Sequence, residues 1–431
     1  EPALDGRRLG IPRGRTLGGT SSINAMIAVR GNRRDFDGWA ERQLPGWSYD
    51  EVLPYFRKSE NHWSGASEHH GIGGPVTITR MEHPDILWEA HRDAAIAAGI
   101  PLNDDPNGAE QDGISRMEST VAKGRRASTA RAYLAPAMQR PNLTIQTGAL
   151  VHRLVIEGSR AVAVEYSLKG KTHVVQADRA IVLSAGAYGS PHILMLSGVG
   201  KADDLREHGI DVVHDLPGVG AELSDHPVVI NEWDLKGDHG LTRRRRVDRA
   251  AIAAARWYLN GSGPFAQTGT LANIFTRLKT DADRPDVQMM CLPLSGDAGL
   301  WFPGTRKPVS RISVRTGYLP LKSRGWVKLR DKDPRSAPRI FLNMFSAPGD
   351  MDGMVESIHL TREIYNQPPL AKLIARENLP GEACRTDAEV ANFVRQTATH
   401  RAHPGCSCRM GHDAGAVVDH KLRVHGIEGL R

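Results

Sequence analysis

A glycine-rich turn near the start of the chain constrains its fold more than any other segment. Residues 14–24 read GRTLGGTSSIN, with adjacent glycines at Gly18 and Gly19 and the hydroxyl residue Thr20 directly after them. Because glycine has no Cβ, the backbone can turn tightly here and come close to a ligand. Apolar residues surround Asn24, so we expect a turn that leads into a buried segment and directs free N–H groups at a polar or anionic ligand. The alternative is an ordinary glycine-rich turn without a ligand.

The size and charge of the chain limit the possible classes of protein. A chain of 431 residues exceeds what one hydrophobic core usually supports, so we expect two domains. The net charge of +7 is a modest excess at this length. The dense basic run Arg243–Arg246 lies between Asp238 and Asp248, which favours a solvated surface loop. We therefore expect no nucleic-acid partner. Weak binding to anionic lipid is kept as an alternative.

Cysteine content and hydropathy indicate the compartment. Four cysteines are too few for a disulfide scaffold at this size, so a reducing compartment fits. No apolar run approaches the roughly 18–20 residues needed to cross a bilayer. We predict a cytoplasmic protein, with peripheral membrane association as the alternative.

A strand and a helix are expected on either side of residue 186. The apolar run Arg179–Ala185 is typical of a buried strand in a largely parallel sheet. A strand-to-helix turn would follow, with Ser190 as the cap and Pro191 at the first helical position. The helix is expected to end near Gly198.

The rest of the chain mixes helical and strand patterns. Strands are expected at residues 143–156, 161–166, 172–176, 312–318 and 326–330, and a helix at residues 350–366. Glycines at positions 158 and 170 mark turns between the first three strands. Mixed α/β regions that alternate with strand-rich regions indicate two interleaved domains.

Three separated segments carry a family resemblance. They are the glycine turn, the run GAYGSPHILMLSGVG at Gly186–Gly200, and HPGCSCRMG at His403–Gly411. In this order they resemble the glucose–methanol–choline (GMC) family of flavoprotein alcohol oxidoreductases, and most of all its branch of choline dehydrogenase and related bacterial alcohol dehydrogenases. Further similar stretches lie at residues 124–130, 216–220, 225–227 and 320–331.

The resemblance implies a mixed α/β (α+β) fold. A Rossmann-like FAD-binding domain would be interleaved with a substrate domain built on an antiparallel sheet with helices. The expected FAD-binding domain comprises residues 1–38, 140–225 and 400–431. The expected substrate-binding domain comprises residues 39–139 and 226–399.

The resemblance also implies which residues contact the flavin. Those expected to line it are Gly18, Gly19, Thr20, Asn24, Ala25, Met26 and Ile27. Those expected on the adenine side and beside the dinucleotide are Val151, Ala185 and Gly186. Covalent members carry a histidine where this chain has Ile23, so we expect FAD to be held non-covalently.

His403 is the expected catalytic residue. Alcohol oxidation requires removal of the hydroxyl proton while the carbon-bound hydrogen leaves as hydride to flavin N5. An imidazole can accept that proton near neutral pH, an effect worth typically ~10²–10⁴-fold in rate. Pro404 disfavours helix at His403, so an extended conformation is expected. Of the 18 histidines, His400 and His412 are expected at the surface and His226 in a packing or hydrogen-bonding role.

The pair Cys406 and Cys408 raises the question of a metal site. Structural zinc usually requires four ligands with wider cysteine spacing. His400 and His403 could in principle serve as the other two ligands. We expect instead that the cysteines are buried free thiols near the flavin and that no metal is bound.

The chain departs from the family pattern at both ends. No G-x-G-x-x-G occurs, because Gly198-Val-Gly200 and Gly218-Val-Gly220 both lack the third glycine. In the family this fingerprint lies upstream of the glycine turn, and a second active-site histidine or asparagine lies downstream of the position of Arg431. We therefore expect the sequence to omit both ends of the flavin domain, which would weaken FAD binding by this polypeptide.

The sequence thus predicts an FAD-dependent oxidoreductase that converts a primary alcohol to the aldehyde. The alcohol would be choline-like, aliphatic or aromatic, and a quinone or oxygen would accept the electrons. Two alternatives stay open. One is a lyase of the cyanohydrin type on the same fold, and the other is a cofactor-free binding protein.

Overall fold

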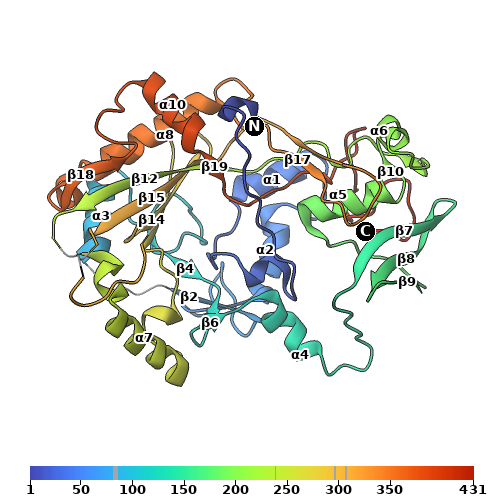
Figure 1. Ribbon diagram of the computed structural model, residues 1–431, viewed down its shortest axis with the longest axis horizontal. Helices are drawn as coiled ribbons and strands as arrows, with labels where there is room; N and C mark the ends of the chain where they lie inside the picture. Colours follow the sequence, from blue (N-terminus) through green and yellow to red (C-terminus); the bar gives the residue numbers. More distant parts are fainter. Residues whose placement is uncertain (81–85, 238, 296–297, 306–307) are drawn as a thin grey trace.

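The computed structural model describes residues 1–431 except 81–85, 238, 296–297 and 306–307. The fold is mixed α/β, as expected, and its largest sheet is antiparallel (Figure 1). Six of its strands follow in the order β18 (Ile374–Leu379), β12 (Pro227–Leu235), β15 (Arg311–Tyr318), β14 (Val287–Leu292), β13 (Ala272–Thr276) and β3 (Gly113–Arg116). The short strand β19 (Thr399–His400) pairs with the start of β12 and so brings the C-terminal region onto the sheet.

One face of this sheet packs on helices, and the alternation of side chains explains why. The helices that contact it include α3 (Ile86–Ala97) and α8 (Asp350–Tyr365), and α9 (Pro368–Ala371) packs on α3 in the same core. The Trp233 ring stacks on Tyr365 of α8 at a centroid distance of 4.0 Å. The hydroxyls of Thr316 and Thr361 lie 2.9 Å apart between β15 and α8. Because neighbouring residues of a strand point to opposite faces, the other face presents Arg315 and Gly317.

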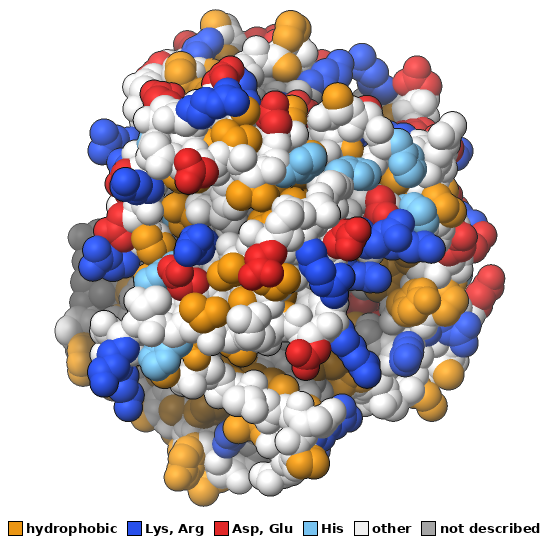
Figure 2. Space-filling model, turned by 90° about the vertical axis from the view of Figure 1, so that its right-hand side faces the viewer, with side chains coloured by type: hydrophobic (Ala, Val, Ile, Leu, Met, Phe, Trp, Pro, Cys, Tyr) orange, Lys and Arg blue, Asp and Glu red, His pale blue; other side chains and the backbone are white. Residues whose placement is uncertain are grey.

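A second region lies at the other end of the molecule, on the right of Figure 1. It contains the antiparallel strands β7 (Leu150–Glu157), β8 (Arg160–Leu168) and β9 (Lys171–Gln176), together with α5 (Gly186–Leu196). The turns between these strands have Gly158 and Gly170 at φ 59° and 78°, which confirms the predicted turns. Figure 2, which shows this end, has basic and acidic side chains interspersed rather than gathered in one patch.

Smaller elements complete the chain. The remaining helices include α1 (Arg33–Glu41), α2 (Tyr49–Ser59), α4 (Ala135–Ala137), α6 (Ala202–Glu207), α7 (Val247–Asn260) and α10 (Asp387–Thr397). The remaining strands include β1 (Glu60–His62), β2 (Val76–Arg80), β4 (Glu118–Ser119), β5 (Val121–Ala122), β6 (Arg125–Arg126), β10 (Val199–Gly200), β11 (His214–Asp215), β16 (Trp326–Lys328) and β17 (Arg339–Phe341). The predicted helix over 350–366 and the predicted strands over 312–318 and 326–330 are confirmed by α8, β15 and β16.

The predicted buried strand over 179–185 is wrong. This segment forms only an isolated parallel bridge between Ile181 and Leu430, and Val182 is 69% exposed. Among the described residues, only the C-terminal segment pairs with residues 179–185. These residues therefore have no second neighbouring strand and are covered on one face at most.

The helix that follows starts earlier than predicted. It begins at Gly186, so Pro191 lies inside it and Ser190 is not its cap. Proline has no N–H to donate to the carbonyl four residues before it, which is that of Ala187. The Ser407 hydroxyl donates to this oxygen at 2.5 Å. A contact from far along the chain thus satisfies the carbonyl that proline leaves free.

Two hydrophobic cores support these regions. The first packs Leu4 and α5 against residues 417–430, but it also includes residues 321–358 and 390–398. The second lies between the large sheet and its helices. The predicted domain boundaries remain a prediction, since these cores are not divided along them. Among the described residues, no helix combines the length and the apolar character that a membrane span requires.

Candidate functional site

The three segments that carry the family resemblance lie together in space. The His400 ring Nε2 lies 2.8 Å from the carbonyl oxygen of Gly10, just before the glycine turn. The Ser407 hydroxyl bonds to Ala187 in α5. Segments separated by roughly 180 to 390 residues therefore converge, as their shared resemblance to a flavin site requires.

The glycine turn has the conformation that its sequence predicts. Gly18 and Gly19 have φ values of 85° and 55°, at the start of a short 3₁₀ helix. A Cβ added to Gly14 would lie 2.3 Å from the Gly19 oxygen, and one added to Gly18 would lie 2.6 Å from Ser22 Oγ. Such distances exclude a larger side chain, so glycine is required for both conformation and close approach.

The segment after the turn is not buried, contrary to the prediction. Ile23 is 51% exposed, and Asn24 and Ala25 are exposed as well. The Arg126 guanidinium holds the segment from one side, donating to the Asn24 backbone oxygen at 2.7 Å and to its Oδ1 at 2.6 Å. Met26 has φ 61°, so the chain bends again here.

Backbone hydrogen bonds fix this segment against β4 and β5. The Thr120 N–H donates to the Met26 oxygen at 2.8 Å, and the Ala28 N–H donates to the Glu118 oxygen at 3.0 Å. Ile27 bridges Ser119. The backbone is therefore rigidly attached on one side, and the exposed side chains of residues 23–25 face away from that attachment.

The N-terminus of α5 supplies a second wall. Ala185 and Gly186 are exposed, and Gly186 has φ 83° with open space where a Cβ would stand. The first N–H groups of the helix have no intrahelical partner and favour a negative charge. The Arg13 guanidinium lies 5.7 Å from the Tyr188 ring of this helix, and the Tyr188 hydroxyl is buried without a hydrogen-bond partner. Val151 is half-buried on β7.

These residues fit a dinucleotide such as FAD. The glycines leave room for close approach, the helix N-terminus suits a phosphate, and the Tyr188 hydroxyl is available as a buried polar group. The structure does not test the individual flavin contacts, which stay predictions.

His403 is held by its backbone beside a buried carboxylate. Its N–H donates to Asp225 Oδ1 at 3.0 Å, and the other oxygen of Asp225 lies 3.2 Å from His400 Nδ1. His403 as a residue is exposed to solvent, although enough protein lies around its ring to affect its pKa. The His226 ring stands perpendicular to it at a centroid distance of 6.0 Å.

The surroundings of His403 keep its imidazole neutral. Partial burial is the main cause that lowers its pKa to about 4, and the nearby His226 and Arg401 lower it further. A neutral imidazole has a free lone pair and can accept a proton. His226 also has a lowered pKa because of burial, and its Nδ1 lies 3.2 Å from the Leu319 oxygen, which confirms its hydrogen-bonding role.

Two of the predicted environments are wrong. His400 is only 7% exposed rather than at the surface, because Asp225 and the Gly10 carbonyl bind both of its ring nitrogens. Cys406 is exposed and has φ 69°, whereas the partly buried Cys408 has its pKa raised to about 12 by burial. The described part of the chain contains no group of three His, Cys, Asp or Glu residues placed to hold a metal. His412 is exposed, as predicted.

Sequence reasoning missed the roles of Asp225 and Arg401. Both guanidinium Nη atoms of Arg401 are engaged, one with Gln288 Oε1 and the other with the backbone oxygens of Gln288 and Arg315, at 2.9 and 2.8 Å. Position 401, two residues before His403, is the only hint in the sequence. Its partners lie on β14 and β15, so no local pattern could have identified them.

Comparison with known proteins identifies the family. Residues 2–228 match the N-terminal model and residues 322–431 the C-terminal model of the GMC oxidoreductases. The chain belongs to the GMC oxidoreductase family. It is 42% identical over 436 residues to an oxygen-dependent choline dehydrogenase of Paraburkholderia phymatum, covering all of this chain and 75% of that protein. It is 39% identical to the mitochondrial choline dehydrogenase of mouse, covering 72% of that protein.

Solved structures agree with this assignment. A formate oxidase of Aspergillus oryzae has a TM-score of 0.89 at 28% identity, covering 97% of this chain and 79% of that one. Pyridoxine 4-oxidase from Mesorbium loti has a TM-score of 0.86 at 29% identity, covering 99% and 80%. The predictions of a GMC flavoprotein oxidoreductase, of FAD as cofactor, and of action on alcohols in general are confirmed. A small-molecule alcohol and an electron acceptor follow from that class.

Proposed function

We propose that this enzyme oxidises a primary alcohol to the aldehyde, with His403 as the base that accepts the hydroxyl proton. FAD, when bound, supplies the acceptor for the carbon-bound hydrogen, which leaves the alcohol as hydride toward flavin N5. The hydroxyl proton and the hydride together account for the two hydrogens lost. The neutral imidazole of His403, beside the converging flavin segments, carries this proposal.

The residues around His403 have supporting roles. Asp225 fixes the backbone of His403 and the ring of His400, so the loop has one conformation. His226 and Arg401 oppose a positive charge on His403 and so keep it ready to accept a proton. None of these three groups needs to exchange a proton with the alcohol.

The cofactor would be held by the glycine turn and by the start of α5. Gly18, Gly19 and the segment 24–27 would line the flavin, and Ala185 and Gly186 would lie beside the dinucleotide. Ile23 cannot form the histidyl link of covalent members, so FAD would be bound non-covalently. We propose that a quinone or oxygen accepts the electrons. We also propose that the two domains have the boundaries predicted from the sequence, and that the enzyme is cytoplasmic or peripheral to a membrane.

Anaerobic reduction of the FAD-loaded enzyme tests the proposal. A primary alcohol should bleach the visible absorbance of the flavin in the absence of oxygen and should yield the aldehyde. If no alcohol bleaches the flavin while the enzyme cleaves a cyanohydrin, the oxidoreductase assignment is wrong and the lyase alternative is correct.

A further inference from the structure

The face of the large sheet that does not pack on α8 carries an unbalanced positive charge near His403. In the register of β12, β15 and β14, Ile230 pairs with Arg315, and Arg315 pairs with Met290. Two residues further along β15, Gly317 pairs with Gln288. Arg315, Gly317 and Gln288 therefore lie on the same face of the sheet. Arg315 is about 7 Å along the strand from the paired residues Gly317 and Gln288.

The guanidinium of Arg401 lies over Gly317 on this face of the sheet. A Cβ on Gly317 would stand 2.7 Å from Arg401 Nε, so the absence of a side chain at position 317 makes room for this guanidinium. The acceptors of its two Nη groups are neutral oxygens, from Gln288 and from the Arg315 backbone. Its Nε–H is buried without an acceptor. A buried cation that lacks a carboxylate is costly, and burial with the nearby Arg315 lowers the pKa of Arg401 to about 9.

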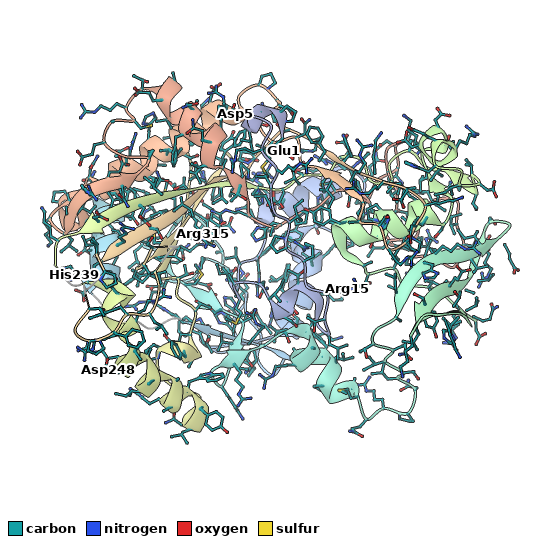
Figure 3. All side chains as sticks on the ribbon, in the orientation of Figure 1. Glu1, Asp5, Arg15, His239, Asp248 and Arg315 are labelled. Atoms are coloured by element: carbon teal, nitrogen blue, oxygen red, sulfur yellow. The ribbon has the colours of Figure 1, made fainter. Side chains whose placement is uncertain are left out.

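Arg315 adds a second guanidinium to the same place. Its side chain is exposed and forms no ion pair with any residue that the structure describes. Figure 3 shows Arg315 where the sheet faces the middle of the molecule. Two guanidinium groups therefore lie on one face, and neither forms an ion pair with a carboxylate of the described residues, although the charge of Asp225 acts on Arg401 from the His403 loop.

The carboxylates nearest to this face already have partners. Asp225 binds the His403 N–H and His400. Glu232 accepts from Asn378 at 2.7 Å, and Asp234 binds two arginines of the sheet at 2.8 Å each. Among the described strands, no carboxylate of this face is left to attract a cationic substrate, and like charges repel each other strongly where water is displaced.

We propose that the physiological alcohol carries an anionic carboxylate, which binds the exposed Arg315 guanidinium beside the charge of Arg401 while its hydroxyl group faces His403. This inference depends on the proposed function and refines it by naming the substrate class as hydroxycarboxylates. A guanidinium suits this task because it binds carboxylates through parallel N–H donors. The same charge opposes a quaternary ammonium such as that of choline.

Three alcohols of similar size test the inference on the FAD-loaded enzyme under anaerobic conditions. They are 4-hydroxybutanoate, the neutral 3,3-dimethylbutan-1-ol, and choline, which differs from the neutral compound mainly by its charge. The apparent second-order rate of flavin reduction should be highest for the anion and lowest for choline. The anion should exceed the neutral alcohol by about 10- to 100-fold, the effect of one charge-assisted hydrogen bond.

The outcomes separate the inference from the proposed function. Faster reduction by choline or by the neutral alcohol than by 4-hydroxybutanoate overturns the inference and leaves the proposed function intact. If another primary alcohol reduces the flavin and 4-hydroxybutanoate does not, the inference is wrong and the proposed function stands.

Variants of Arg315 identify the residue responsible. Arg315→Gln should remove the preference for the anion by about 10- to 100-fold and leave the rate with the neutral alcohol within about twofold. Arg315→Lys should restore most of the preference. Arg140→Gln, which changes an exposed arginine far from the sheet, is the matched control and should have no effect.

A binding measurement gives a readout that does not depend on turnover. Butanoate has the carboxylate but no hydroxyl, and calorimetry should show about 10-fold weaker binding to Arg315→Gln than to the wild type. If this variant instead loses affinity for FAD and keeps the anion preference, the guanidinium serves the cofactor and the inference is wrong.

Discussion

A buried cluster of charged groups beside residues 26–28 should make the stability of this enzyme depend on pH. The rings of His62 and His70 stack at a centroid distance of 3.6 Å. His70 Nδ1 lies 3.0 Å from Glu60 Oε1, and its Nε2 lies 3.0 Å from Asp105 Oδ1. Burial alone would lower the pKa of His70, but hydrogen bonds to Asp105 and Glu60 raise it to about 9. His70 is therefore an imidazolium at neutral pH.

The size of the effect follows from the pKa of His70 in the two states. A rise from 6.5 in the unfolded chain to about 9 in the folded one corresponds to roughly 3 kcal/mol. The Asp105 side chain is 45% exposed, so water screens part of this interaction and we expect about 2 kcal/mol. Because the folded pKa is the higher one, this stabilisation is complete below about pH 6.5 and is lost as the pH rises through about 9.

Two other charged groups face the cluster. The Arg30 guanidinium donates to Glu60 Oε1 at 2.8 Å, and Glu118 Oε1 lies 3.3 Å from His62 Nε2. The pKa values of Glu60 and Asp105 are both lowered by hydrogen bonds that outweigh burial. The stabilisation from these carboxylates is present above their unfolded pKa values and is lost as the pH falls through the lowered folded ones. The cluster thus stabilises the fold at intermediate pH. The stabilisation is lost in acid when the carboxylates are protonated and in alkali when His70 loses its proton.

Urea unfolding of His70→Gln, followed by circular dichroism, measures the effect. At about pH 7 the variant should be less stable than the wild type by about 2 kcal/mol or more, since two carboxylates lose their cation. The difference should shrink by about 2 kcal/mol at about pH 10, where the wild-type imidazolium has lost its proton. His359→Gln removes an exposed histidine that lies 2.8 Å from Asp387, and as the matched control it should change stability by less than about 1 kcal/mol.

A difference between His70→Gln and wild type that is equal at both pH values would refute this reasoning, and so would an equally large effect of His359→Gln. The cluster is also connected to the backbone at Ala28, because the Asn107 amide donates to the Ala28 oxygen at 3.1 Å and to Glu118 at 2.8 Å. Hydrogen exchange of the Ala28 amide should therefore accelerate in His70→Gln.

Three further predictions concern the site itself. His403→Ala should slow anaerobic flavin reduction by about 10²–10⁴-fold while FAD stays bound, and an unchanged rate in stopped-flow spectroscopy would exclude His403 as the base. Gly14→Ala should lower the melting temperature because its Cβ meets the Gly19 backbone, whereas Gly38→Ala in α1, where the added Cβ meets nothing within 4 Å, should raise it slightly. Acid precipitation of the loaded enzyme should release all FAD into the supernatant; a yellow pellet would show a covalent bond.

Local patterns in the sequence were sufficient for several elements. The 16-residue helix α8 and the turns at Gly158 and Gly170 lie where hydrophobic spacing and glycine placed them. These features depend on neighbours within a few residues, whose chemistry is visible in the chain itself. The prediction of a buried strand at residues 179–185 was wrong because an apolar sequence does not show which other strands will pair with it.

The sequence by itself determined the family, the cofactor and the conformation of the glycine turn, because each of these depends on short motifs with fixed spacing. Only the tertiary structure decided that His400 is buried, that Ser407 satisfies the carbonyl which Pro191 leaves free, and that Arg401 reaches β14 and β15. The His403 N–H and its carboxylate partner are 178 residues apart. Burial and charge balance depend on such distant contacts, so they are fixed when the chain folds and not by any local pattern.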